Sequence, residues 1–361
     1  MKATRKLHDA GQSLWLDNIT RNLLTGGGLK RYISEYSLTG LTSNPTIFDK
    51  AIKNSSDYDS SIRQKNSEGK SGEELFFELA LEDCTAAADL FRPIHEMTNG
   101  VDGWVSLEVS PKLAYETSRT VAAARELHMR GGRPNLFIKI PGTREGIPAI
   151  EQSIFEGIPI NVTLLFSREQ YLAAANAYIR GIERRIGAGR NPLVPSVASL
   201  FISRWDVAVN KKTPESLHNR IGIAIAKRTY KAYRDLLGSD RWLRLANFGA
   251  RSQRLLWAST GTKDPNASDV LYIGSLAAPH TINTMPENTL TAFEDHGSVG
   301  RMLPRGGGNA GQELSEFVRA GIDVDKTAEE LQQEGAEAFV KSWEDLMSCI
   351  EEKTAELGKA S

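Results

Sequence analysis

Short apolar segments alternate with amphipathic helical patterns along most of the chain. The segments that predict strands are SLWLDNI (13–19), SLTGLTSN (37–44), GWVSLEVS (103–110), NLFIKIPG (135–142), PINVTLLF (159–166), LVPSVASLF (193–201), RLLWAST (254–260) and HTINTM (280–285). Most are apolar on both faces, which is typical of parallel strands covered by helices. These segments and the helices between them predict one (β/α)8 TIM barrel, an α/β fold, with extra N- and C-terminal helices. A doubly wound open sheet is the alternative.

Helix starts are marked by capping residues. Ser110-Pro111 and Thr213-Pro214 each predict an N-cap followed by proline at the first helical position. Capping-box spacing occurs in three pairs, Ser167/Gln170, Ser71/Glu74 and Thr327/Glu330. Apolar stripes predict the buried helix faces, namely Tyr178, Ile182 and Ile186, and Phe339, Trp343, Leu346 and Ile350.

Residues 1–361 are predicted to form a single domain, because no segment has the composition of a linker. The Gly-rich stretch RMLPRGGGNAGQ (301–312) is short. It lacks the Gly-Lys-Ser/Thr ending of a phosphate-binding loop, so we expect a flexible surface loop there.

Composition excludes several classes of function. Lys plus Arg (44) nearly balance Asp plus Glu (45), which argues against the broad basic surface of a nucleic-acid binder. The two cysteines, Cys84 and Cys349, are too few for a disulfide framework or a cysteine-based zinc site, and we expect them to pack inside helices. The six histidines lack metal-ligand spacing, so no metal is expected.

The N-terminal residues MKATRKLHDAGQ lack the apolar region of a signal peptide, and no apolar run is long enough to span a membrane. We therefore expect a soluble, cytoplasmic protein without a membrane partner. The sequence does not fix the oligomeric state, which could be a monomer or a homodimer.

A polar residue interrupts the end of most predicted strands. These residues are Asp17, Asn44, Glu108, Lys139, Thr163 and Ser199. From Glu108 onward the intervals, to Lys139, Thr163 and Ser199 in turn, are 31, 24 and 36 residues, about one βα unit each. The six side chains would therefore converge at the C-terminal end of a barrel, where catalytic groups of this fold collect.

Each of these residues also has a structural interpretation. Asp17 alone would more often be a turn former or an N-cap, and Asn44 before proline begins a turn readily. Thr163 and Ser199 would individually be ordinary strand residues. Lys139 lies between Ile138 and Ile140, so its stem is enclosed, although its ammonium group could still reach solvent.

An enclosed lysine can attack a carbonyl as a neutral amine and form a Schiff base. A lysine of ordinary pKa is neutral in only about one molecule in 2,500 at pH 7. Apolar enclosure favours the neutral amine, whereas neighbouring carboxylates favour the ammonium. Once formed, an iminium accepts electrons from a neighbouring carbon–carbon bond, and two carboxylates would suit the proton transfers that accompany cleavage and imine hydrolysis.

Five motifs resemble those of the transaldolases, in particular the longer bacterial branch. They are GLTSNPTIF, VSLEVSP, FIKIPGT, INVTLLFS and LLWASTGTK, and the resemblance runs from about residue 8 to the C-terminal helix. It implies a class I aldolase barrel, circularly permuted relative to other Schiff-base aldolases, without a cofactor. It also implies transfer of a dihydroxyacetone unit from sedoheptulose 7-phosphate to glyceraldehyde 3-phosphate, in the non-oxidative pentose phosphate pathway.

The resemblance assigns roles to individual residues. Lys139 would be the Schiff-base lysine and Asp17 the proton acceptor during carbon–carbon cleavage, while Glu108 and Thr163 would hold a water that moves protons. Asn44, Asn161 and Thr42 would bind substrate hydroxyls or the Schiff-base intermediate.

The phosphate ligands implied by ASLFISR are Ser199 and Arg204, whose guanidinium suits a phosphate dianion, although a surface arginine that pairs locally is the alternative. Many transaldolases place a further arginine after strand seven, in an ASFR stretch. This chain has ASTGTK there, so Ser259 and Lys263 would be the substitutes.

Two other functions compete with this interpretation. A fructose 6-phosphate aldolase uses the same lysine, but that family has shorter chains and tends to carry Gln at the position of Glu108. A non-catalytic sugar-phosphate-binding barrel is the alternative from another class.

Overall fold

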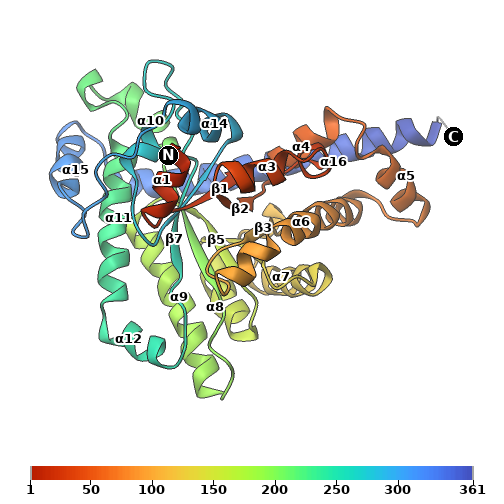
Figure 1. Cartoon of the computed structure of the whole chain (residues 1–361), viewed down its shortest axis with the longest axis horizontal. Coiled ribbons are helices and arrows are strands. Elements are labelled where there is room, and N and C mark those ends of the chain that lie inside the picture. Colours follow the sequence, from red (N-terminus) through yellow and green to blue (C-terminus); the bar gives the residue numbers. More distant parts are fainter. Residues whose placement is uncertain (1, 360–361) are drawn as a thin grey trace.

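The computed structural model describes residues 2–359, and within that range eight parallel strands close into one barrel (Figure 1). Their order around the barrel follows the chain, and β8 pairs with β1. This pairing confirms the predicted barrel and rules out the open sheet, which would leave two strand edges exposed. The strands are β1 (Ser13–Asp17), β2 (Leu38–Thr42), β3 (Trp104–Glu108), β4 (Leu136–Pro141), β5 (Ile160–Leu165), β6 (Ser196–Phe201), β7 (Arg254–Ala258) and β8 (Ile282–Met285).

Helices surround the barrel and extend from it, and α1 and α16 are the predicted extra terminal helices. The α-helices are α1 (Ala3–Asp9), α2 (Arg21–Thr25), α3 (Gly28–Glu35), α4 (Pro45–Lys53), α5 (Asp59–Ser67), α6 (Gly72–Met97), α7 (Thr117–Gly131), α8 (Gly146–Glu156), α9 (Arg168–Gly187), α10 (Ser203–Val209), α11 (Ile221–Leu237), α12 (Asp240–Asn247), α13 (Leu271–Ser275), α14 (Glu287–His296), α15 (Ala310–Arg319) and α16 (Val324–Lys359). Single 3-10 turns form η1 (Pro111–Leu113), η2 (Asn210–Lys212) and η3 (Glu215–Leu217).

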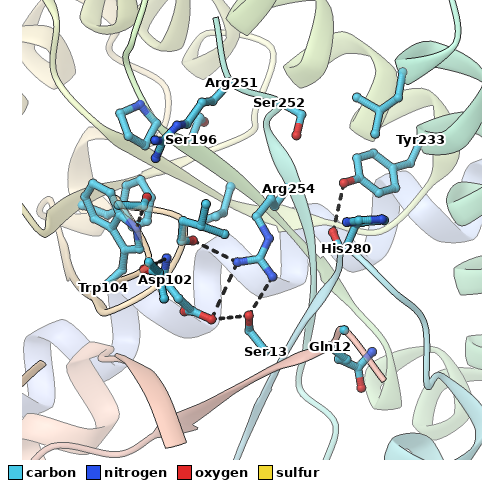
Figure 2. A pocket seen from close by; sticks show the side chains of 18 of the residues that line it. Gln12, Ser13, Asp102, Trp104, Ser196, Tyr233, Arg251, Ser252, Arg254 and His280 are labelled. Carbon is cyan, nitrogen blue, oxygen red and sulfur yellow. Dashed lines mark hydrogen bonds and ion pairs between the residues drawn. The ribbon is translucent and has the colours of Figure 1, made fainter. Parts of the chain in front are cut away.

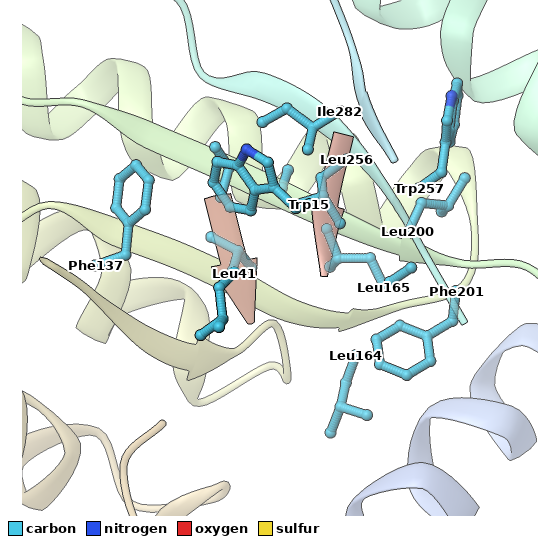
Figure 3. Close-up of a cluster of buried hydrophobic side chains, with 14 of the residues drawn as sticks. Trp15, Leu41, Phe137, Leu164, Leu165, Leu200, Phe201, Leu256, Trp257 and Ile282 are labelled. Atoms are coloured by element: carbon cyan, nitrogen blue, oxygen red, sulfur yellow. The ribbon is translucent and has the colours of Figure 1, made fainter. Parts of the chain in front are cut away.

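Large buried side chains pack inside the barrel and between its strands and the helices (Figure 3). The Trp15 and Phe137 rings, from the non-adjacent strands β1 and β4, lie 6.3 Å apart, and Phe137 stacks on Trp104 of β3 at 4.0 Å. Gly40 of β2 leaves room for the Trp15 indole, because a Cβ there would lie 2.5 Å from the ring. Side chains two residues apart on a strand share a face, so the residue two positions beyond each of these aromatic rings also points inward.

The last helix links the barrel to the long helices beside it. In Figure 1, α16 crosses the barrel and continues far beyond it next to α4 and α5. It also contacts η1 and β5, so it passes over the C-terminal end of the barrel. Its predicted apolar stripe is buried, and both cysteines, Cys84 on α6 and Cys349 on α16, are buried as expected.

Two predicted helix starts are only single 3-10 turns. Pro111 begins η1, but Ser110 accepts no capping hydrogen bond, and α7 starts at Thr117 because Glu116 has a non-helical backbone. After Pro214 the turn η3 is followed by Asn219, whose φ of 59° is left-handed, and α11 starts at Ile221. Proline pre-sets the first helical φ but does not determine whether the helix continues.

The capping boxes have mixed outcomes. Ser167 caps α9 by accepting from the N–H of Gln170, as predicted. Ser71 precedes α6 but its side chain makes no capping bond among the described residues. Thr327 lies inside α16, where Asp323 is the capping residue and accepts from the N–H of Lys326. An acidic residue four positions earlier therefore displaced the predicted cap.

The Gly-rich stretch is a surface loop as far as Asn309, and its last three residues belong to α15. The flexibility expected of this loop stays a prediction, as does the division of the chain into one domain. Across residues 2–359, no helix has both the length and the apolar character that crossing a membrane requires.

Candidate active site

The predicted site residues gather at one end of the barrel because parallel strands all end there. Asp17 and Glu108 are the last residues of β1 and β3, each two positions beyond an inward tryptophan or serine. Lys139 lies two positions beyond Phe137 and therefore also points inward. Strand register then pairs Glu108 with Lys139 on adjacent strands.

A cavity of about 350 Å³ opens at this end. It is lined by Asp17, Thr42, Asn44, Thr46, Ile47, Lys50, Lys139, Thr163, Ser199, Phe201, Arg204, Ala258, Ser259, Gly261, Lys263, Thr284, Pro286 and Phe339. The lining contains nine of the eleven predicted site residues, and its size suits a small polar substrate.

The Lys139 side chain is enclosed rather than extended to solvent. The residue is only 5% exposed, and its Nζ donates to Glu108 Oε2 at 2.9 Å and to the carbonyl of Ser43 at 3.2 Å. The Phe339 ring of α16 covers it from 5.5 Å. The alternative in which the ammonium group reaches solvent is therefore wrong.

Two buried oxygen atoms beside Lys139 are unpaired. Within residues 2–359, neither Glu108 Oε1 nor Thr163 Oγ1 has a hydrogen-bond partner. Burial raises the pKa of the Glu108 carboxyl, and the neighbouring Lys139 charge opposes that rise. Buried polar atoms are normally paired, so each of these two atoms marks a place where a water or a substrate atom can bind.

Asp17 is held in place by a threonine pair. Thr42, its register partner on β2, donates to Asp17 Oδ1 at 2.9 Å and shares a 2.7 Å hydrogen bond with Thr284 of β8. Burial raises the pKa of the Asp17 carboxyl, and the charges of Lys139 and Lys263 oppose the rise. The helix after β1 is capped by Thr20, so the capping alternative for Asp17 is wrong.

The two asparagines differ in whether they line the cavity. Asn44 caps α4 by accepting from the N–H of Ile47 at 3.1 Å, and it also lines the cavity. Asn161 of β5 is fully buried; it donates to Ser106 at 3.0 Å and accepts from Ser199 at 2.7 Å. Its place outside the cavity lining makes it a support for Ser199, and a direct contact with substrate stays a prediction.

Arg204 does not pair locally with an acidic residue. Its half-buried guanidinium lies 5.4 Å from the Phe201 ring centre and 5.8 Å from that of Phe339, and no described carboxylate lies within ion-pair distance. Burial lowers the pKa of Arg204 and the charge of Glu334 opposes the fall, and the surface alternative for this residue is wrong. A half-buried cation that faces a cavity, with no described carboxylate within ion-pair distance, is suited to an anionic ligand.

Ser259 and Lys263, the predicted substitutes for the arginine after strand seven, also line the cavity. Ser259 has a left-handed φ of 56°, unusual for a serine, and its Oγ lies 2.9 Å from Ser203 Oγ. Lys263 is exposed at the cavity edge. Strained backbone of this kind concentrates at functional sites, and Leu164, next to Thr163, is a second case with φ of 59°.

Nine lining residues were not predicted, among them Thr284, Lys50 and Phe339. Thr284 lies near the end of β8 and would have been found by extending the strand-end rule to HTINTM. Lys50 lies on α4, one turn beyond the motif around Asn44, and Phe339 belongs to an apolar stripe typical of core. No local signal distinguishes the latter two from surface and core positions.

No group of three or more His, Cys, Asp or Glu side chains in the described range is arranged to hold a metal ion. The side chains at this end of the barrel offer an amine, two carboxyls, hydroxyls and cationic groups suited to anions.

Comparison with known proteins gives the relatives of this chain. Residues 14–350 match the family model described as transaldolase/fructose-6-phosphate aldolase. Among curated proteins, a transaldolase of Thermobifida fusca is 44% identical over 97% of this chain and 98% of its own length. A transaldolase of Saccharopolyspora erythraea is 44% identical over 96% of each chain, and transaldolase 2 of a Nostoc species is 40% identical over 96% of each. The chain belongs to the transaldolase/fructose-6-phosphate aldolase family.

Proposed function

We propose that this chain is a transaldolase, a transferase that moves a dihydroxyacetone unit from sedoheptulose 7-phosphate to glyceraldehyde 3-phosphate. The products are erythrose 4-phosphate and fructose 6-phosphate. The observation that carries the proposal is the enclosed Lys139, which contacts one carboxylate directly and lies beside two unpaired buried oxygens. Full-length similarity to several transaldolases supports the same activity.

The first step is Schiff-base formation. The neutral amine of Lys139 attacks the ketone carbon, forming a carbon–nitrogen bond, and the oxygen then leaves as water. Glu108 is placed to accept the amine proton at 2.9 Å. A water held between Glu108 Oε1 and Thr163 Oγ1 would then deliver that proton to the leaving oxygen, because both atoms lack other partners among the described residues.

The second step breaks the carbon–carbon bond. Asp17 removes the proton of the substrate hydroxyl next to that bond, the hydroxyl oxygen becomes the aldehyde, and the bond electrons move into the iminium to give an enamine. Erythrose 4-phosphate leaves, and the enamine carbon attacks the aldehyde of glyceraldehyde 3-phosphate while Asp17 returns the proton. A carboxyl whose pKa is raised by burial is a stronger base for this purpose than an ordinary aspartate.

The phosphate group would bind at the outer edge of the cavity. Arg204 offers a guanidinium without an acidic partner in the described range, and Ser199 offers a hydroxyl oriented by Asn161. Lys263 and Lys50 add positive charge at the cavity edge. Closure of the cavity by Phe339 would exclude water from the enamine, which protects it from protonation.

Trapping tests the lysine and the chemistry together. The protein is treated with fructose 6-phosphate and borohydride, and the intact mass and the modified peptide are measured. We expect a reduced adduct on Lys139 and none in Lys139→Ala, which should also lose about 10⁴-fold or more in activity. Absence of an adduct in the unmodified chain would support the non-catalytic sugar-phosphate-binding barrel instead.

A second assay separates the two activities within the family. Transfer from fructose 6-phosphate to erythrose 4-phosphate is compared with release of free dihydroxyacetone. We expect transfer to dominate; dominant release would identify a fructose 6-phosphate aldolase. Location in the cytoplasm and the choice between monomer and homodimer stay predictions.

A further inference from the structure

A second and larger cavity, of about 590 Å³, lies at the opposite end of the barrel (Figure 2). Its lining includes the first residues of four strands, namely Ser13, Trp104, Ser196 and Arg254. Because all strands are parallel, this cavity and the one around Lys139 are separated by the packed interior of the barrel. Its volume is typical of pockets that bind small molecules.

A satisfied ion pair forms the floor of this cavity. Figure 2 shows Arg254, Asp102 and Ser13 joined to one another by dashed lines. Asp102 accepts from Ser13 Oγ and from Trp15 Nε1, the latter at 2.8 Å, and lies 3.9 Å from the Arg254 guanidinium. Arg254 also donates to Ser13 Oγ at 2.7 Å and to two carbonyls. Asp102 therefore offsets part of the Arg254 charge.

The remaining charge in the cavity is positive. Asp102 is the sole acidic side chain among the described residues that line it, and it is already paired. Arg234 and Arg251 also line the cavity, and neither lies within ion-pair distance of a carboxylate in residues 2–359. Arg234 donates to the Tyr230 hydroxyl at 3.2 Å, while its buried Nε has no acceptor in the described range.

His280, one of the two histidines that line the cavity, is affected by the same positive charges. Burial lowers the pKa of His280, and the charges of Arg234 and Arg254 lower it further. An anion bound among these arginines would relieve this repulsion and supply the missing hydrogen-bond acceptors.

Part of the cavity wall is apolar. Trp104, Phe137 and Val197 line it but are almost fully buried, whereas the half-buried Pro195 and Leu237 present aliphatic surface to the cavity. Inorganic phosphate would leave this surface in contact with water, whereas a ligand with a compact apolar group would cover it.

We propose that this cavity is a second ligand site, which binds a small phosphate monoester through Arg234 and Arg251 with its organic group against Pro195 and Leu237. The site is independent of the proposed transaldolase chemistry, since it shares no lining residue with the cavity around Lys139.

Calorimetric titration tests the proposal, with phenyl phosphate as the probe. The titration uses the Arg204→Gln chain, so that the candidate phosphate ligand at the other end is absent. We expect one saturable site, and the further changes Arg234→Gln and Arg251→Gln should together weaken binding by about tenfold or more. Arg63→Gln, which removes an exposed charge on α5, should leave the affinity unchanged.

Two controls keep the result decisive. Phenol, which lacks the phosphate, should not bind, and inorganic phosphate should bind at least about threefold more weakly than phenyl phosphate. Ser252→Asp, which places a carboxylate in the cavity lining without removing an arginine, should also weaken binding, and circular dichroism checks that each variant is folded. Unchanged affinity in the folded arginine and aspartate variants, or no binding, would overturn the site; equal affinity for inorganic phosphate would overturn the monoester assignment.

Discussion

Both ends of the barrel hold a buried pair of opposite charges, yet the two pairs are built differently. At the C-terminal end, Lys139 and Glu108 are 2.9 Å apart, and Glu108 Oε1 has no partner in the described range. At the N-terminal end, both oxygens of Asp102 accept hydrogen bonds, and Arg254 donates to a hydroxyl and two carbonyls. One pair leaves atoms free to react, whereas the other uses its atoms to join strands.

The difference shows what to look for in a buried ion pair. A fully satisfied pair has low energy in one arrangement and resists change, so it suits a structural role. A pair with an unpaired oxygen is costly in the resting protein and becomes favourable when a ligand or water fills the gap. The burial of the side chains alone does not distinguish the Lys139–Glu108 pair from the Arg254–Asp102 pair.

The largest expected effect lies at the C-terminal end. Asp17→Ala should reduce turnover by about 10²–10⁴-fold, because the base for carbon–carbon cleavage is lost. Borohydride should still trap the Schiff base on Lys139, since that step uses Glu108. Steady-state kinetics and mass spectrometry measure the two effects; near-normal turnover would refute the role given to Asp17.

The next effect concerns the N-terminal pair and should appear in stability rather than in catalysis. Asp102→Ala leaves the buried Trp15 N–H without its acceptor and Arg254 without its carboxylate partner, so the free energy of unfolding should fall by about 3 kcal/mol. Turnover per folded molecule should change little. Urea unfolding and activity titration test this, and Asp102→Asn, which keeps one acceptor, should lose less. A large loss of turnover in the folded variant would contradict the structural role given to Asp102.

Arg204→Gln should have a smaller effect, confined to phosphorylated substrates. We expect KM for glyceraldehyde 3-phosphate to rise by about tenfold while kcat changes little, because the guanidinium binds the phosphate in ground and transition states alike. Glyceraldehyde, which lacks the phosphate, should be unaffected. The exposed Lys263→Gln serves as the matched control and should change KM less. Equal losses on both acceptors would contradict phosphate binding by Arg204.

The smallest expected effect is a change in the pH dependence of stability. Burial raises the pKa of Glu108 in the folded chain, so between its unfolded value and the raised folded value the folded state holds more protons. Stability from this group is therefore greatest below the unfolded pKa and falls as pH rises through the folded pKa. Glu108→Gln should flatten that part of the curve, measured by urea unfolding between acid and neutral pH. An unchanged slope would show that the unpaired oxygen does not penalise the charged form.

Sequence patterns predicted most of the fold because apolar runs and capping residues are local features of the chain. Each strand was predicted from a short apolar run, and all eight runs contain an observed strand. The failures were at helix starts, such as Pro111 and Thr327, where neighbouring residues compete for the same backbone N–H groups. Local chemistry favours a cap at several positions, and packing of the whole helix selects among them.

The polar strand ends were likewise visible in sequence, because the period of a strand and the common direction of parallel strands bring Asp17, Glu108 and Lys139 together. Phe339 and Lys50 were not visible. Both reach the cavity from helices, Lys50 from α4 and Phe339 from α16, and these two helices pack against each other. Phe339 lies 200 residues after Lys139, so no local pattern shows that the two residues meet.

The sequence by itself determined the barrel, its family resemblance and the lysine with its two carboxylates, since these follow from local periodicity and from residue types at strand ends. Only the tertiary structure decided which buried atoms are satisfied. The unpaired Glu108 and Thr163 oxygens, the paired Asp102 and the unneutralised arginines of the second cavity depend on distances between segments remote in the chain. Pairing within a low-dielectric interior changes by several kcal/mol over about an ångström, and no local pattern records such distances.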